Sequence, residues 1–202
     1  DPALWYNNEI KKYEGYCSDI FTDEALKFIE QNKSNQFFCY LSFNAPHTPL
    51  QVPEKYYDLY KDIDPSNFYE EVTYEMTERD VNDAKKIYGM VTNIDENFGK
   101  LLYKLEELDI KENTIVIFLT DNGPQQTRYV SNLRGLKSQV YNGGIKVPLY
   151  FSYPKLYKKA KDIDFFGAHI DVLPTLSKLC NLTIPSDRTV SYTHLRAHET
   201  KA

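Results

Sequence analysis

Residues 115–124, which read IVIFLTDNGP, decide the fold of this chain. Five apolar residues are followed at once by a threonine, an aspartate, an asparagine and a Gly-Pro turn. An apolar run of this length that ends in turn residues predicts a buried strand of a mostly parallel sheet. In open α/β sheets, ligands bind at the carboxyl ends of the strands. Asp121 and Asn122 would lie there and offer the hard oxygen atoms that Ca²⁺ or Mg²⁺ prefers, although an Asx turn would also account for both residues.

Helix and strand patterns alternate in the rest of the chain. After a polar, aromatic loop over residues 1–15, Thr22 is a candidate N-cap for a helix, and residues 37–43 form a second apolar run of the buried-strand type. A long helical stripe spans residues 81–108, and residues 145–151 form another apolar strand. This alternation predicts one α/β domain with a mostly parallel sheet.

Two more polar residues follow strands of the predicted sheet. His47 lies between Pro46 and Pro49, which stiffen the backbone after the run at residues 37–43. Lys137 lies on a loop between two predicted strands, where it could reach an anion. Taken singly, the histidine would be an ordinary loop residue and the lysine a solvated surface cation. With a divalent cation, however, a histidine and a lysine suit a tetrahedral oxyanion, which indicates a hydrolase of a phosphate or sulfate ester.

Composition excludes other classes of function. The formal net charge of the 202 residues is −5, and no Lys/Arg cluster of the kind that follows a phosphate backbone is present, so we expect no nucleic-acid partner. No apolar stretch reaches 18 residues, so we expect no membrane span. The three cysteines form neither a CxxC metal motif nor an evident disulfide framework.

Several motifs resemble those of the sulfatase family, within the alkaline-phosphatase-like superfamily, in the family's order and at family-like spacing over roughly residues 15 to 185. The motifs are NAPHTPL at residues 44–50, TDNG at 120–123, LRGLK at 133–137, GGIKVP at 143–148 and HIDVLPT at 169–175. Lys146 stands where the family usually carries arginine. The resemblance implies part of a three-layer α/β/α sandwich with a mostly parallel central sheet.

The resemblance also implies roles for the four site residues. Asp121 and Asn122 would be two ligands of a Ca²⁺ ion that holds the sulfate and the nucleophile. His47 would bind the sulfate and act as general acid toward the leaving oxygen, and Lys137 would contact a sulfate oxygen. The parent protein would thus hydrolyse a sulfate ester of a small molecule or glycan, in the periplasm or after secretion.

Other parts of the family's site have no counterpart in this sequence. The family's nucleophile is a formylglycine made in a Cys-x-Pro-Ser-Arg-type motif, and the surroundings of Cys17, Cys39 and Cys180 do not match it. The family's N-terminal Asp-Asp metal ligands are missing as well. We therefore expect residues 1–188 to be the middle-to-C-terminal part of a catalytic domain, truncated at both ends and inactive by itself. Residues 189–202 resemble translated adaptor sequence and are set aside.

Two alternatives to a sulfatase stay open at this point. One is a phosphate or phosphonate ester hydrolase of the same superfamily, since the metal pair and the histidine would suit either anion. The other is a catalytically dead domain that binds sulfated glycans. The acidic and aromatic residues 51–79 could line a carbohydrate or aryl pocket, although a core or lid uses the same residue types.

Overall fold

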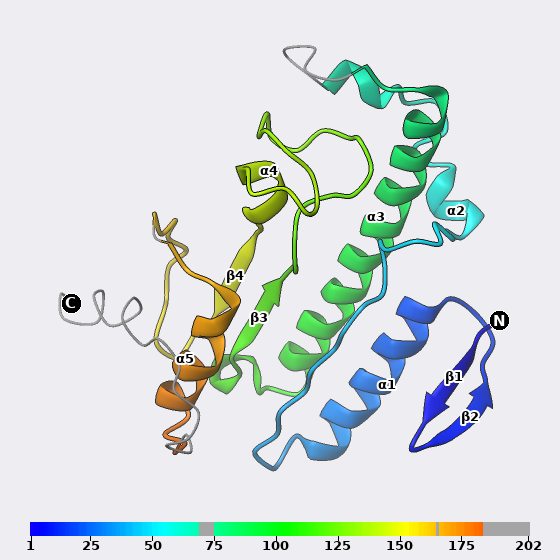
Figure 1. The fold of residues 1–202 in the computed structure, drawn as a ribbon. Helices are drawn as coiled ribbons and strands as arrows, with labels where there is room; N and C mark the ends of the chain where they lie inside the picture. Colours follow the sequence, from blue (N-terminus) through cyan, green and yellow to red (C-terminus); the bar gives the residue numbers. More distant parts are fainter. Residues whose placement is uncertain (69–74, 165, 184–202) are drawn as a thin grey trace. The chain divides into compact units, whose positions relative to one another are not determined.

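The computed structural model describes residues 1–68, 75–164 and 166–183, and it divides into two units, residues 1–157 and residues 158–202. Each unit is described by itself. The first holds a hairpin, two long packed helices and a second strand pair (Figure 1). Its helices and strands are β1 (Ala3–Tyr6), β2 (Glu9–Lys12), α1 (Cys17–Asn32), α2 (Glu54–Tyr57), the 3₁₀ turn η1 (Pro65–Phe68), α3 (Glu78–Glu107), the 3₁₀ turn η2 (Lys111–Asn113), β3 (Val116–Leu119), α4 (Asn142–Ile145) and β4 (Leu149–Ser152).

The core of the first unit lies where α1 and α3 pack together. The helical stripe predicted over residues 81–108 is confirmed as α3, and its apolar residues recur three and four positions apart on the covered side. Buried apolar side chains come from both helices: Ile20, Ala25, Ile29, Ala84, Ile87, Met90, Ile94 and Leu105. Full burial of one such side chain, as at Ile87, stabilises the fold by about 1.5–3 kcal/mol.

A polar cluster is enclosed within this helix–helix interface. Asn93 and Asn97 are both 0% exposed, and each side-chain amide donates to the same oxygen of Asp19, at 2.8 and 2.7 Å. The Asn97 amide also approaches Asn93 Oδ1 at 3.2 Å, and Lys100 Nζ donates to Asn97 Oδ1 at 2.9 Å. Buried polar groups are tolerated only when they are paired, so this cluster specifies one alignment of α1 against α3.

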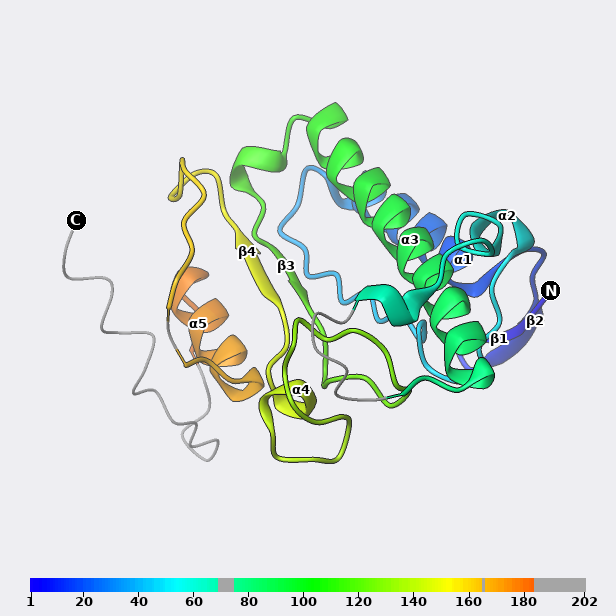
Figure 2. The same ribbon diagram turned by 90° about the horizontal axis from the view of Figure 1, so that it is seen from above.

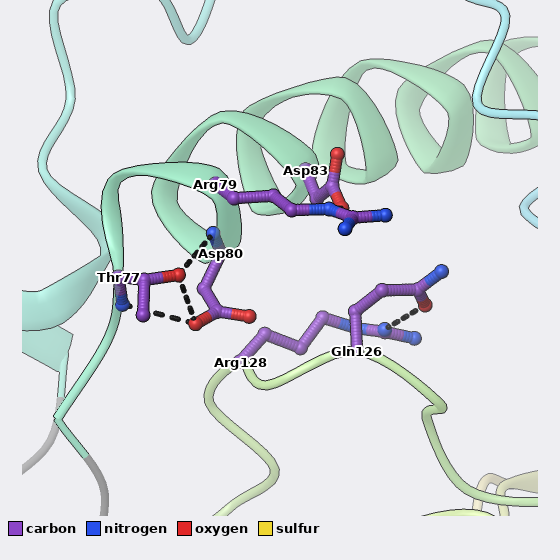
Figure 3. Close-up of polar contacts among 6 residues, drawn as sticks. All are labelled: Thr77, Arg79, Asp80, Asp83, Gln126 and Arg128. Carbon is purple, nitrogen blue, oxygen red and sulfur yellow. Dashed lines mark hydrogen bonds and ion pairs between the residues drawn. The ribbon is translucent and has the colours of Figure 1, made fainter.

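The first turn of α3 is closed by a capping box (Figure 3). Asp80 N–H donates to Thr77 Oγ1 at 3.2 Å, while the Thr77 N–H and hydroxyl both donate to the Asp80 carboxylate, at 2.9 and 2.6 Å. These bonds favour the charged carboxylate and lower the pKa of Asp80 below its ordinary value. The helix therefore begins at a defined residue.

The two strand pairs are both antiparallel. Strand β1 pairs with β2 around Asn7 and Asn8, whose positive φ values of 48° and 67° suit a two-residue hairpin turn. Strand β3 pairs with β4, with Phe118 opposite Tyr150. The strand predicted from IVIFL is thus confirmed, although it is half-buried rather than buried, while the loop predicted for residues 1–15 was wrong. The mostly parallel central sheet is not shown by the described residues.

Residues 37–43 do not form the predicted strand. They alternate between half-buried and exposed side chains, as a strand does, and Phe38 and Tyr40 are 73% and 82% exposed. No other described segment pairs with them, however, so this extended segment has no inter-strand hydrogen bonds of a sheet. In the view of Figure 2 the segment runs between α3 and β3. The prediction failed because a strand needs a neighbour, which the segment's own sequence does not supply.

Two predicted boundaries also need correction. Helix α1 begins at Cys17 after an extended Tyr16, five residues before the N-cap proposed at Thr22. Thr22 lies buried inside the helix, where its hydroxyl donates to the Ser18 carbonyl at 2.8 Å. The strand predicted for residues 145–151 begins only at Leu149, because residues 142–145 form α4.

The second unit contains a 3₁₀ turn, η3 (His169–Asp171), and α5 (Val172–Leu179). Asp171 is the residue just before α5, and its carboxylate accepts from the Ala168 N–H at 2.8 Å, which closes η3 and leaves α5 without a side-chain cap. The proposed adaptor tail lies outside the described residues. Over the described ranges, no helix is both long enough and apolar enough to cross a bilayer.

Replacing Asn93 by alanine should lower the free energy of unfolding by about 1–3 kcal/mol, because Asp19 and Asn97 would each lose a partner in a covered site. Urea unfolding followed by circular dichroism measures the change. Asp95→Ala, an exposed position on the same helix, is the matched control and should stay within about 0.5 kcal/mol. Equal stability of the two variants would contradict a stabilising cluster.

Candidate functional site

The loops that follow β3 are joined through the backbones of three glycines. Gly123 N–H donates to the Gly144 carbonyl at 2.9 Å, and Gly143 N–H donates to the Arg134 carbonyl at 2.7 Å. A Cβ atom at Gly123 would collide with the Gly143 carbonyl, and one at Gly143 with the Gly135 carbonyl. All three are buried, as the absence of side chains allows. We call this arrangement of Gly123, Gly143 and Gly144 the glycine joint.

The glycine joint is continued by a bond that fixes the Lys137 loop. Lys137 N–H donates to the Pro124 carbonyl at 2.7 Å, which ties the lysine backbone to the turn directly after Asn122. Gln139 Oε1 accepts from the Leu136 N–H at 3.0 Å and holds the same loop from within. The segments at residues 121–124, 133–137 and 141–145 thus form one connected loop cluster. The Lys137 side chain is half-buried, and its ammonium makes no ion pair with a described residue.

Asp121 and Asn122 present oxygen atoms beside this joint. The Asn122 side-chain NH₂ donates to the Gly123 carbonyl at 2.9 Å, which differs from an Asx turn, where the side-chain oxygen accepts from the backbone N–H two residues on. That bond occupies the nitrogen and leaves Oδ1 as a free acceptor. The Asp121 carboxylate is exposed and takes no hydrogen bond or ion pair from the part of the chain that the structure describes. The pair therefore offers one carboxylate and one amide oxygen.

His47 lies in a turn after the extended segment 37–43. Its N–H donates to the Asn44 carbonyl at 2.9 Å, and its Nδ1 lies 2.8 Å from the carbonyl oxygen of Thr48. A carbonyl oxygen only accepts, so Nδ1 carries the hydrogen and Nε2 is left for another partner. The side chain is exposed, which makes Nε2 accessible to a bound molecule.

The structure brings together three of the four predicted residues. The backbone bond from the Lys137 N–H to the Pro124 carbonyl connects the Lys137 loop to Asp121 and Asn122, whereas no hydrogen bond or ion pair between described residues joins His47 to them. Sequence reasoning missed the contribution of Gly123 and Gln139. The Gly-Pro after Asn122 was visible as a turn, but no residue near it in the sequence indicates that Gly123 bonds to the Gly144 carbonyl.

These donors fit part of a hard-metal site. A carboxylate and an amide oxygen are ligands of the kind that Ca²⁺ and Mg²⁺ take. These two oxygens do not complete a Ca²⁺ site, because Ca²⁺ takes six to eight oxygen ligands. Within the described ranges, no group of three or more His, Cys, Asp or Glu side chains could hold a metal ion. Lys137, which is tied to the same loop cluster through its backbone N–H, adds one cation to it.

Comparison with known proteins shows the family to which the chain belongs. The family model described as Sulfatase matches residues 2–182. An arylsulfatase of Clostridium perfringens is 29% identical over 92% of this chain and 44% of its own length. The ulvan-active sulfatase of Formosa agariphila is 28% identical over 89% of this chain and 35% of its own length. The chain belongs to the sulfatase family, within the alkaline-phosphatase-like superfamily.

A solved structure gives the same answer for the fold. The crystal structure of Ps i-CgsB in complex with k-i-k-neocarrahexaose superimposes with a TM-score of 0.78 at 28% identity, covering 92% of this chain and 39% of that chain. The α/β fold expected for this family is therefore shared. The chain spans less than half the length of these relatives.

Replacing Gly123 by alanine should open the loop cluster, because the new methyl group would meet backbone that cannot move aside. Amide hydrogen exchange at Lys137 and Gly143, whose N–H groups are bonded at 2.7 Å, should accelerate at least about tenfold. Gly99→Ala is the matched control, since a methyl group there meets nothing within 4 Å in a helix. Unchanged exchange in the Gly123 variant would show that the joint does not hold these loops.

Proposed function

We propose that the protein to which this chain belongs hydrolyses a sulfate ester, with the described loop cluster forming one side of its active site. The observation that carries the proposal is the loop cluster after β3. There the glycine joint and the bond from the Lys137 N–H to the Pro124 carbonyl tie a carboxylate–amide pair and a lysine together. Sulfate-ester hydrolysis is the activity named for the arylsulfatase relative. Secretion or a periplasmic location remains a prediction from the family.

In this proposal Asp121 and Asn122 hold a Ca²⁺ ion together with ligands that lie outside the described residues. The Asn122 Nδ2 bond to the Gly123 carbonyl turns Oδ1 outward, and the exposed Asp121 carboxylate would supply the negative charge. A bound Ca²⁺ would neutralise charge on sulfate oxygens. The nucleophile would come from the same missing part of the site, so the 202-residue chain alone would bind ligands without turnover.

His47 and Lys137 would act on the sulfate group itself. The bond from Nδ1 to the Thr48 carbonyl leaves His47 Nε2 as the atom that contacts sulfate and, when protonated, gives a proton to the leaving oxygen. Lys137 would place its ammonium against a sulfate oxygen and stabilise the charge that develops as the ester bond breaks. The backbone bond at Pro124 would fix the lysine relative to the metal pair.

Adding CaCl₂ to the purified 202-residue chain should shift the side-chain amide signals of Asn122 in NMR spectra, with weak, millimolar-range affinity because the ligand shell is incomplete. Asp121→Asn should abolish the shift, whereas Asp95→Asn, which removes an exposed carboxylate elsewhere, should preserve it. Shifts of equal size in both variants would mean that Ca²⁺ binds without the proposed pair.

In the longer protein, a Cys-x-Pro-Ser-Arg-type motif should precede this region, and an aryl sulfate offered as a model substrate should be hydrolysed. Lys137→Ala should lower kcat at least about 100-fold, as loss of one group that stabilises developing negative charge does. Lys111→Ala, on an exposed ion pair with Glu106, is the control and should leave kcat unchanged.

A Thr or Ser nucleophile with phosphate-ester hydrolysis would replace this proposal by the phosphatase alternative. Turnover by the 202-residue chain itself would contradict its proposed inactivity.

A further inference from the structure

The segment after His47 is held firmly against the N-terminal half of α3. Tyr56 is 3% exposed, and its hydroxyl donates to Glu96 at 2.6 Å. The carbonyl of Tyr56 lies so close to Gly89 that a Cβ atom there would sit 2.9 Å from it. Further along, the hydroxyls of Tyr60 and Thr92 are 2.6 Å apart. The surface built by this segment is therefore fixed in shape.

Two shallow hollows, both largely open to solvent, lie on that surface and share a ridge. The first, of about 460 Å³, and the second, of about 550 Å³, are both lined by Tyr57 and Asn82. The Tyr57 hydroxyl donates to Asn82 Oδ1 at 3.2 Å, so the ridge is a bonded pair. We call the two hollows with this ridge the Tyr57 groove. Two adjoining hollows separated by one aromatic ring suit consecutive rings of a linear chain molecule better than one compact ligand.

The lining of the Tyr57 groove matches the chemistry of a sugar ring. Apolar contacts from Leu50 and Val52 suit the C–H face of a ring, and the Gln51 and Asn82 side chains carry amide donors and acceptors for hydroxyl groups. The aromatic ring of Tyr57 adds a stacking surface with a polar tip. Most ligand sites combine apolar walls with a few placed polar groups in this way.

Charge in the second hollow selects against anionic units. Asp62, Asp64 and Glu78 line it, with Lys85 as the cation among its lining residues. The Lys85 ammonium is already bonded to the Lys61 carbonyl at 2.7 Å. Carboxylates accept hydrogen bonds from hydroxyl groups but repel sulfate. A sugar unit bound in this hollow would therefore carry no sulfate.

The Tyr57 groove adjoins the proposed active site along the chain. Leu50, in its lining, follows His47 by three residues. The loop after β3 reaches the same end of α3: Figure 3 shows Gln126 and Arg128 beside the first turns of that helix. Burial raises the pKa of Tyr88 on α3, and the nearby Arg128 charge opposes that rise. Because Leu50 follows His47 so closely in the chain, a chain molecule bound at His47 could extend toward the groove.

We propose that the Tyr57 groove binds uncharged sugar units of a glycan whose sulfated unit is presented to His47 and Lys137. As a substrate subsite this role rests on the proposed function, but sugar binding itself does not require turnover. The substrate would then be a sparsely sulfated oligosaccharide or polysaccharide, with neutral units next to the sulfated one, rather than a small aryl sulfate or a densely sulfated polymer.

Saturation-transfer NMR on the purified 202-residue chain tests this with three neutral hexasaccharides: cellohexaose, hexa-N-acetylchitohexaose and neoagarohexaose. At least one should receive saturation at its ring C–H protons. Tyr57→Ala should weaken that binding at least tenfold, whereas Tyr57→Phe, which keeps the ring, should retain most of it. Tyr40→Ala removes a tyrosine that is 82% exposed outside the groove and is the matched control, which should bind as the unmodified chain does. Circular dichroism of each variant confirms that it is folded.

Binding of none of the three sugars, or equal binding by the Tyr57→Ala variant, would overturn the inference. The fully sulfated form of whichever sugar binds should bind at least tenfold more weakly, and Tyr57-dependent binding of equal strength would overturn the preference for neutral units. The Ca²⁺ titration of Asp121 is independent of this result. Sugar binding without Asp121-dependent Ca²⁺ binding would therefore refute the proposed active site alone, and the reverse result would refute the groove alone.

Discussion

The candidate site depends on one close approach of backbone to backbone. Gly123 bonds to Gly144 at 2.9 Å, and no side chain could occupy the space between the two segments. Because glycine lacks a Cβ atom, the loop after β3 can touch the turn before β4 and the Lys137 loop at once. The chemistry proposed for Asp121, Asn122 and Lys137 follows from this contact, since none of these side chains binds another directly.

The helix pair provides a rigid body on one side of that site. Asp19 joins two fully buried asparagines across α1 and α3, and the capping box at Thr77 defines where α3 begins. The segment that carries Tyr57 is held on the same helix by the hydroxyl bonds of Tyr56 and Tyr60. Functional surfaces on rigid elements can be placed more accurately than surfaces on free loops. The proposed groove therefore has a fixed wall, whatever the mobility of its ligand.

Local patterns predicted some features well and others poorly, for identifiable reasons. The stripe of α3 was found because 3.6-residue periodicity is a property of one segment. The strand at residues 37–43 was overpredicted because its apolar run is real, yet no described segment pairs with it in a sheet. Thr22 was misplaced because threonine can bond either at a helix start or, as here, to a carbonyl one turn earlier. The hairpin at Asn7 and Asn8 was missed although its turn residues were visible.

The sequence by itself determined the family, because its motifs survive as short strings around Asp121, His47 and Lys137, and the family match over residues 2–182 agrees with them. It also determined which atoms the site could offer, since residue type sets donor and acceptor chemistry. Only the tertiary structure decided that Gly144 meets Gly123, that His47 Nδ1 bonds to the Thr48 carbonyl, and that Tyr57 and Asn82 form one ridge. The first and third contacts join residues that are distant in the chain, and the second depends on the orientation of one side chain. Neither kind of contact leaves a periodic or compositional signal in the sequence.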